Sequence, residues 1–221
     1  MPAKNSVKQF EPERMYHVYN RGVDKRTIFE DERDYAVFMS LLKSALLRSQ
    51  DDDEDPIDLS LLSEAQRFNM RRLNLAQELD LTAFCLMPNH FHLLLFQKSA
   101  DGITRLMRSI GTAYSMYFNK RYERSGTLFQ GRYKAKAIDS DAYWQHISRY
   151  IHLNPLDIAG TYKDYEYSSY KYYSGMASAT WIKPSLILGS FANKKEYGQF
   201  HEDYLLHRNQ LLDIKDMLAD K

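Results

Sequence analysis

The sequence of 221 residues contains a single cysteine, Cys85, so no disulfide can form within the chain. Glycine and proline are scarce, with nine and six residues, which excludes the fibrous and disordered classes of protein. No apolar stretch approaches the roughly 20 residues of a membrane span. The first residues have no apolar segment of the kind found in a secretory signal. These absences indicate a globular, cytoplasmic protein.

The net charge of +1 comes from 30 basic and 29 acidic residues and excludes a globally basic DNA-coating protein. The charges are nevertheless unevenly distributed. Residues 51–64 hold seven acids and no base, whereas residues 96–136 hold nine bases and two acids, a local net charge of +7. The acidic run predicts a solvated loop between two helices. The basic segment predicts a local cationic surface.

Hydrophobic periodicity predicts four strands and four helices before residue 160. Strands are expected at residues 15–20, 81–87, 91–96 and 132–138, and helices at 31–49, 59–79, 103–122 and from 139 or 140 to 154. This order indicates an α+β fold with a ferredoxin-like antiparallel sheet and helices on one face. Residues 1–160 would form this domain. Residues 161–221, which are rich in tyrosine, would form a helical C-terminal extension packed on it.

Two histidines of the segment PNHFHLLLF lie two residues apart on an expected strand. Side chains alternate along a strand, so His90 and His92 face the same side and Phe91 points into the core. Two imidazoles side by side can bind one divalent ion. The same spacing also fits two polar residues on the wet face of a half-buried strand, so the pair alone leaves both interpretations open.

The helix expected before Pro155 carries a second set of candidate residues. Tyr150 and Asn154 are four residues apart and share one helix face. The Asn154 amide oxygen is a hard ligand suited to Mg²⁺ or Mn²⁺, and the Tyr150 phenol could attack phosphorus once deprotonated. With 17 tyrosines in the chain, Tyr150 could equally be an ordinary residue at the boundary of the core. His146, one turn earlier, and His17, on the first strand, are further candidates for the same site.

A candidate DNA-binding surface is predicted within the basic segment. Arg132, Lys134 and Lys136 alternate on an expected strand and would form one cationic row. Together with the cations of the preceding helix they resemble a groove that follows phosphates, whereas the alternative is a scattered solvated surface. The full set of candidates is Arg105, Arg108, Lys120, Arg121, Arg124, Arg132, Lys134 and Lys136.

Four separated motifs occur in the order YHVYNRG, PNHFHLLL, SGTLFQGRYKA and SRYIHLNPLDIAG. Together they resemble the HUH-type single-tyrosine transposases with an IS200-like domain, in particular the group associated with repetitive extragenic palindromes (REP). The resemblance extends over roughly residues 14–175. By motif position, His90 and His92 match the histidines of the HUH pair, Tyr150 matches the nucleophile, and Asn154 matches a third metal ligand. Many members of the broader class have glutamine at that last position.

The resemblance implies a transposase and endonuclease acting on single-stranded or hairpin DNA. His90, His92 and Asn154 would hold Mg²⁺ or Mn²⁺. Tyr150 would attack a phosphodiester and remain joined to the 5′ phosphate, with release of a 3′-hydroxyl. A 3′-hydroxyl from another end could then reverse the step and complete strand transfer without a nucleotide cofactor. The protein would act as a monomer or a homodimer, without a membrane partner.

Three other functions stay open at this point. A DNA-binding protein of the same fold that no longer transfers strands would bind DNA without a covalent bond. A metal hydrolase would use water in place of tyrosine. A plain RNA-binding ferredoxin-like domain is disfavoured, because no RNA-binding strand motif of the glycine-aromatic type appears. A covalent protein–DNA adduct would distinguish the transposase from all three.

Overall fold

The computed structural model describes residues 10–47, 60, 62–65, 67 and 73–206. In this part of the chain a four-stranded antiparallel sheet has the strand order β2-β3-β1-β4. The strands are β1 (Arg14–Arg21), β2 (Leu79–Met87), β3 (His90–Gln97) and β4 (Lys134–Ile138). The α+β class and the antiparallel sheet predicted from the sequence are therefore confirmed.

Seven α-helices are assigned among the described residues, besides a short 3-10 turn at Val23–Lys25. They are α1 (Glu32–Leu46), α3 (Gly102–Arg121), α4 (Asp141–Leu153), α5 (Leu156–Ala159), α6 (Tyr170–Ser174), α7 (Ser185–Leu188) and α8 (Lys194–Leu206). The start of α1 follows from its N-cap, because the Asp31 carboxylate accepts hydrogen bonds from the amides of Arg33 and Asp34.

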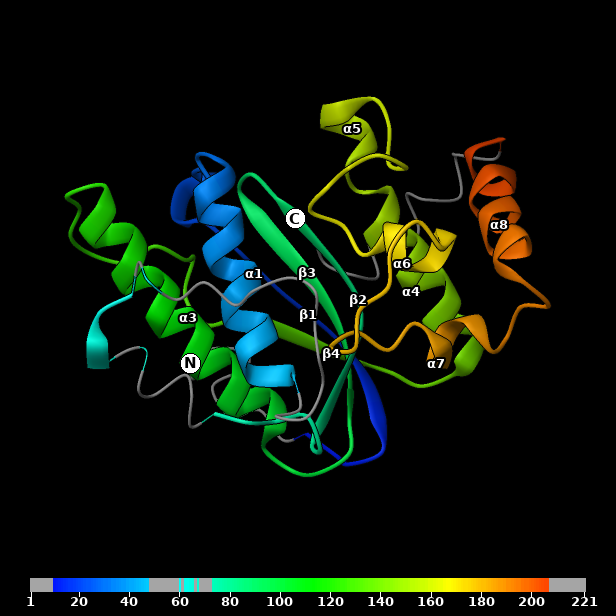
Figure 1. Ribbon diagram of the computed structural model, residues 1–221, viewed down its shortest axis with the longest axis horizontal. Helices are drawn as coiled ribbons and strands as arrows, with labels where there is room; N and C mark the ends of the chain where they lie inside the picture. Colours follow the sequence, from blue (N-terminus) through cyan, green and yellow to red (C-terminus); the bar gives the residue numbers. More distant parts are fainter. Residues whose placement is uncertain (1–9, 48–59, 61, 66, 68–72, 207–221) are drawn as a thin grey trace, which may run out of the picture.

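The sheet is covered by helices on both faces. One face packs against α1 and α3 and includes Val18, Phe84 and Phe91. The other packs against α4 and the C-terminal helices and includes Leu94 and Ile138. Figure 1 shows α1 and α3 on one side of the strands and α4, α6, α7 and α8 on the other. The expectation of helices on one face therefore holds for α1 and α3 but is wrong for α4, which packs on the other face together with the C-terminal helices.

The prediction of a helix at residues 59–79 is wrong at its C-terminal end. Residues 73–75 are not helical, residues 76–78 form a turn, and β2 begins at Leu79. The Leu75 amide donates to the carbonyl of Ala45 at the end of α1, and Leu79 pairs with Gln97 of β3. These tertiary contacts override the local helical pattern. The rest of that helix, and most of the acidic run, lie in or beside residues outside the described ranges.

The C-terminal extension is hydrogen-bonded to the edge strand β2. The Leu86 amide donates to Tyr167, the Ser169 amide donates to Phe84, and the Lys183 amide donates to Leu81, each over 2.8 to 2.9 Å. These bonds occupy backbone groups that an edge strand would otherwise leave unpaired. No helix among the described residues combines the length and hydropathy that a membrane span requires.

Candidate active site

Strand register gathers the candidate side chains on the sheet face that packs against α4. His92 lies opposite Tyr19, and His17 lies opposite Lys136. Because side chains alternate along a strand, His90 shares this face with His92. Phe91 points to the opposite face, where it is 1% exposed and packs against Phe38. Its burial stabilises the fold by about 1.5–3 kcal/mol and fixes which way the two histidines point.

His92 and His17 form a fully buried pair. The Nε2 of His17 lies 2.8 Å from the Nδ1 of His92, and both residues are 0% exposed. Burial lowers the pKa of His17 to about 3, and the charge of Lys136 adds to this shift. Burial, followed by the neighbouring His90 and His17, holds the pKa of His92 well below its ordinary value. Both imidazoles are therefore neutral at pH 7, as metal ligation requires.

The orientation of His90 is fixed by its neighbour Asn89. The Nδ1 of His90 lies 2.7 Å from the Oδ1 of Asn89. Since an amide oxygen only accepts hydrogen bonds, the proton of His90 is on Nδ1 and the lone pair is on Nε2. That lone pair faces the Oδ1 of Asn154 at 3.4 Å. The Nδ2 of Asn154 donates to the Tyr150 carbonyl over 2.9 Å, which turns its oxygen toward His90.

Two acceptor atoms that face each other across 3.4 Å repel one another unless a cation lies between them. Ligands adjacent on one Mg²⁺ at ~2.1 Å lie about 3 Å apart, close to the observed separation. The Nε2 of His92 is buried and has no hydrogen-bond partner among the described residues, and a cation would satisfy it as well. His90, His92 and Asn154 therefore fit a divalent ion.

The third ligand of such an ion would have to be an amide. In the described part of the chain, no three side chains of histidine, cysteine, aspartate or glutamate are grouped as metal ligands. Asn154 ends α4 as its C-cap residue, directly before Pro155, which cannot continue the hydrogen bonding of the helix. The sequence therefore places this amide at a fixed point opposite β3.

Tyr150 lies between the histidines and an open cleft. Its ring meets that of His92 edge-on, with centroids 5.5 Å apart, and that of His17 at 6.2 Å. The residue is 5% exposed but lines a cleft of about 750 Å³ together with His90 and Asn154. The structure thus brings together the four residues that the motifs single out.

The basic candidates divide into two groups. Arg132 and Lys134 line the same cleft as Tyr150, and Lys136 is exposed on the same sheet face, opposite His17. One detail of the predicted row is wrong, because β4 begins at Lys134 and Arg132 precedes it. The loop before β4 is held to β1 instead, through the bond from the Gln130 amide to the Arg21 carbonyl.

The helical cations are placed differently. Arg105 pairs with Glu78 at 2.7 Å, and Arg121 binds both Asp31 and Asp34, so both guanidiniums are used in ion pairs. Arg124 donates to Asn119. Lys120 and Arg108 are exposed on α3, away from the cleft of Tyr150. Only tertiary structure reveals these pairings, since the acidic partners are far away in the sequence.

A buried polar network holds α4 in place behind Tyr150. His152 contacts the Tyr197 hydroxyl at 2.8 Å and the Ser169 hydroxyl at 2.7 Å, and Ser169 also accepts a hydrogen bond from the Phe84 amide of β2. His152 therefore has a structural role. His146 faces α8, where it contacts Arg149 at 2.9 Å and the ring of Phe200, so it lies outside the candidate site.

Two members of the site were not found from the sequence. Asn89 sets the tautomer of His90. Tyr19 lines the cleft, and its ring lies 4.9 Å from that of His17. The alternation of Tyr19 with His17 along β1 was the signal that could have identified it.

Comparison with known proteins agrees with this geometry. Residues 62–154 match the family model described as Transposase IS200 like. The resemblance expected from the motifs is therefore confirmed over this part of the chain. This similarity supports a transposase role. None of the curated proteins matches the chain.

A solved structure shows the same fold. A REP-associated tyrosine transposase bound to a REP hairpin is similar over 81% of this chain and 90% of its own, with 12% identity and a TM-score of 0.54. A candidate transposase from Deinococcus radiodurans R1 matches over 68% of this chain and 95% of its own, with 16% identity. Its TM-score of 0.36 is too low to support an argument.

Proposed function

We propose that this protein cleaves single-stranded DNA with Tyr150 and rejoins it, as a transposase acting at hairpin-forming repeats. One observation carries the proposal. The facing acceptors His90 Nε2 and Asn154 Oδ1, 3.4 Å apart, lie in a cleft that Tyr150 also lines. The fold shared with a transposase solved on a REP hairpin supports hairpin DNA as the ligand.

His90, His92 and Asn154 would hold the divalent ion, Mg²⁺ or Mn²⁺. When bound, such an ion supplies Lewis-acid polarisation of a phosphate oxygen. Neutral histidines suit this role, because burial lowers the pKa of His92 and its lone pair is available without deprotonation. Asn89 would act behind the ligands by holding the ring of His90 in its ligating tautomer.

Tyr150 would carry out the covalent step. Its phenol oxygen attacks the phosphorus, a tyrosine–phosphate ester forms, and the bond from phosphorus to the 3′ oxygen breaks. The phenol proton is passed through solvent to the leaving oxygen, so the products are a 5′-phosphotyrosine and a free 3′-hydroxyl. Attack by another 3′-hydroxyl reverses these changes and joins the new ends without an energy source.

The surroundings of Tyr150 favour transfer to DNA over hydrolysis. The rings of His17 and His92 pack against it, and only 5% of the residue is exposed, which restricts access of water to the ester. Arg132 and Lys134 line the cleft and would bind the flanking phosphates. A scissile phosphate would therefore be positioned beside the nucleophile.

A denaturation-resistant adduct tests the proposal. The full chain is incubated with Mn²⁺ and a hairpin oligonucleotide with single-stranded flanks, labelled at its 3′ end, because the fragment with the 5′ phosphate stays on the protein. We expect labelled protein after denaturation, and none from Tyr150→Phe. Tyr143→Phe, on the same helix and 49% exposed, is the matched control and should label normally.

The other outcomes separate the alternative functions. Free labelled fragment without an adduct would indicate a hydrolase that uses water. A mobility shift with neither adduct nor fragment would indicate a DNA-binding protein without strand transfer. Label that persists in Tyr150→Phe would show that Tyr150 is not the nucleophile.

A further inference from the structure

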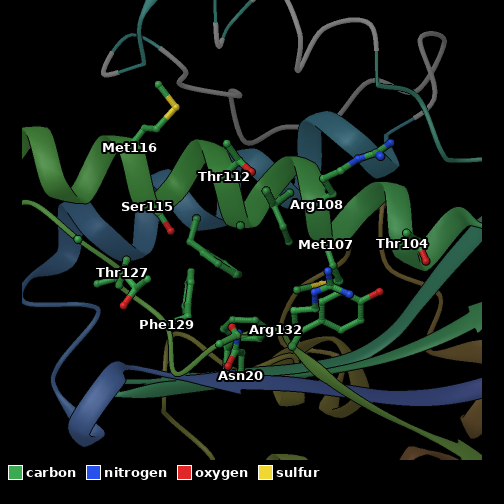
Figure 2. Close-up of a pocket in the computed structure, with 18 residues that line it drawn as sticks. Asn20, Thr104, Met107, Arg108, Thr112, Ser115, Met116, Thr127, Phe129 and Arg132 are labelled. Atoms are coloured by element: carbon green, nitrogen blue, oxygen red, sulfur yellow. The ribbon is translucent and has the colours of Figure 1, made fainter. Parts of the chain in front are cut away.

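A second cavity, of about 790 Å³, lies between α3 and the loop of residues 126–133, on the side of the sheet away from α4. In Figure 2 the helix α3 runs above this cavity, and Thr127, Phe129, Arg132 and Asn20 lie below it. Asn20 and Arg132 also line the cleft of Tyr150. The two cavities therefore meet at the end of β1, where one ligand can reach both.

The loop below the cavity is fixed to the sheet. Phe129 forms an antiparallel bridge with Gly22, the Val23 amide donates to the Leu128 carbonyl, and Asn20 donates to the Gly131 carbonyl. The cavity wall is thus built by specific hydrogen bonds. Its shape is largely formed before any ligand arrives, as is usual for binding sites of 300–1,000 Å³.

Gly111 leaves space in the wall formed by α3. A glycine inside a helix costs about 1 kcal/mol relative to alanine. Apart from its chain neighbours and the backbone of α3 itself, no atom of the described residues lies within 4 Å of the position that a Cβ would take there, so neither packing nor crowding calls for glycine. Gly126 and Gly131, which also line the cavity, have φ of 85° and 86° and are explained by their backbone. Gly111 is best explained by close approach of a ligand.

The lining chemistry suits a nucleobase. Phe129 and Tyr133 offer aromatic surface, and hydroxyl groups are available to the polar edge of a base. Among the described residues of the lining, Arg108 and Arg132 are charged and none is acidic, so these walls do not repel a phosphate backbone. These hydroxyls are those of Thr112, Ser115 and Thr127.

We infer that this cavity binds an unpaired base of the same DNA strand whose scissile phosphate lies at Tyr150. The DNA strand would pass from one cavity to the other along Arg132 and Asn20. The inference rests on the proposed function for the identity of the ligand. It extends that function by assigning α3 and residues 126–133 to recognition of the single-stranded flank.

The test combines a filled cavity with a missing base. Gly111→Leu places a side chain in the cavity, and abasic sites are introduced one at a time along the flanks of a hairpin oligonucleotide. Kd is measured by fluorescence anisotropy in a Tyr150→Phe background, so that no cleavage interferes. Base–aromatic contacts of about 1–3 kcal/mol correspond to a loss of about 5- to 150-fold in affinity.

In the protein with Gly111, we expect an abasic site at one position of the flank to raise Kd by about tenfold or more. In Gly111→Leu, the same abasic site should leave Kd unchanged. Gly111→Ala gives a smaller loss and serves if the leucine variant does not fold. Gly198→Ala is the matched control, because it is a helical glycine in α8 whose Cβ would meet the Tyr170 hydroxyl at an ordinary 3.8 Å. It should leave Kd unchanged.

Two results would overturn the inference. One is an equal Kd for Gly111→Leu and the protein with Gly111. This result would mean that the cavity does not bind DNA and takes another class of ligand, such as a peptide. The other is an abasic effect of the same size in both. Adduct formation by Gly111→Leu with wild-type Tyr150, at saturating DNA, is scored separately. An intact adduct with unchanged Kd refutes the cavity and spares the proposed function, whereas absence of any adduct from the wild type refutes the proposed function itself.

Discussion

The Nε2 of His17 lies 2.8 Å from the Nδ1 of His92, and both rings are fully buried. If His92 binds an ion through its Nε2, its Nδ1 carries the proton and donates a hydrogen bond to the Nε2 of His17. Ligating histidines commonly use their second nitrogen in this way, although the usual acceptor is a carboxylate or carbonyl. His17 is therefore a positioning residue for the candidate metal ligand.

Replacing His17 with phenylalanine should weaken Mn²⁺ binding by about 10- to 100-fold, the range typical for loss of a ligand's hydrogen-bond partner. The ring volume is kept, so the fold should survive. Calorimetric titration of DNA-free protein with Mn²⁺ gives the affinity without relying on activity. His146→Phe, a histidine on α4 that contacts Arg149 instead, should bind Mn²⁺ as the wild type does. Equal affinities for both variants would contradict the role of His17.

Asn154 is expected to contribute an oxygen ligand. Asn154→Ala removes that oxygen and also the hydrogen bond to the Tyr150 carbonyl, so Mn²⁺ affinity should fall and stability should drop by about 1 kcal/mol. Asn154→Asp keeps an oxygen of the same reach and adds a negative charge, so Mn²⁺ affinity should be kept or increased. The same calorimetric titration distinguishes them. Equal losses of Mn²⁺ affinity in the two variants would rule out ligation by this side chain.

The cations near the cleft should determine how strongly DNA binding depends on salt. Each phosphate contact to a single strand contributes about −0.7 to the slope of log affinity against log salt. Replacing Arg132, Lys134 and Lys136 with glutamine should therefore reduce the magnitude of that slope by about 2. The control removes the same charge elsewhere, at Lys171, Lys194 and Lys195. Identical slopes for the two triple variants would exclude these residues from the DNA path.

Acid should destabilise the fold through its buried histidines. Burial lowers the pKa of His201 from 6.5 to about 3, so below pH 6.5 the unfolded state binds a proton that the folded state does not. This contribution to the free energy of unfolding is complete above pH 6.5 and decreases as the pH falls toward 3. His201→Phe should reduce the slope of the free energy of unfolding against pH by about 1.4 kcal/mol per pH unit. Urea unfolding at several pH values measures this slope. An unchanged slope would mean that His201 is not buried and neutral.

The sequence predicted the strands and most helices because their periodicity is local. It also predicted that His90 and His92 share a face, since alternation is a property of any strand. It could not show that α4 covers that face, because which layer lies over a strand depends on contacts far away in the sequence. The ion pairs of Arg105 and Arg121 were hidden for the same reason, because their acidic partners are far away in the sequence. The hydrogen bond between the neighbours His90 and Asn89 depends instead on the orientation of two side chains, which residue spacing does not encode.

The network around His152 has a consequence for where the function can be interrupted. Ser169 and Tyr197 of the C-terminal extension form hydrogen bonds with His152 of α4, and Ser169 also accepts a hydrogen bond from β2. The position of the Tyr150 hydroxyl thus depends on side chains that take no part in the proposed reaction. A stop codon before Ser169 would leave every candidate ligand and the candidate nucleophile in the gene product. It would nevertheless remove the contacts that hold α4, and with it Tyr150, in position.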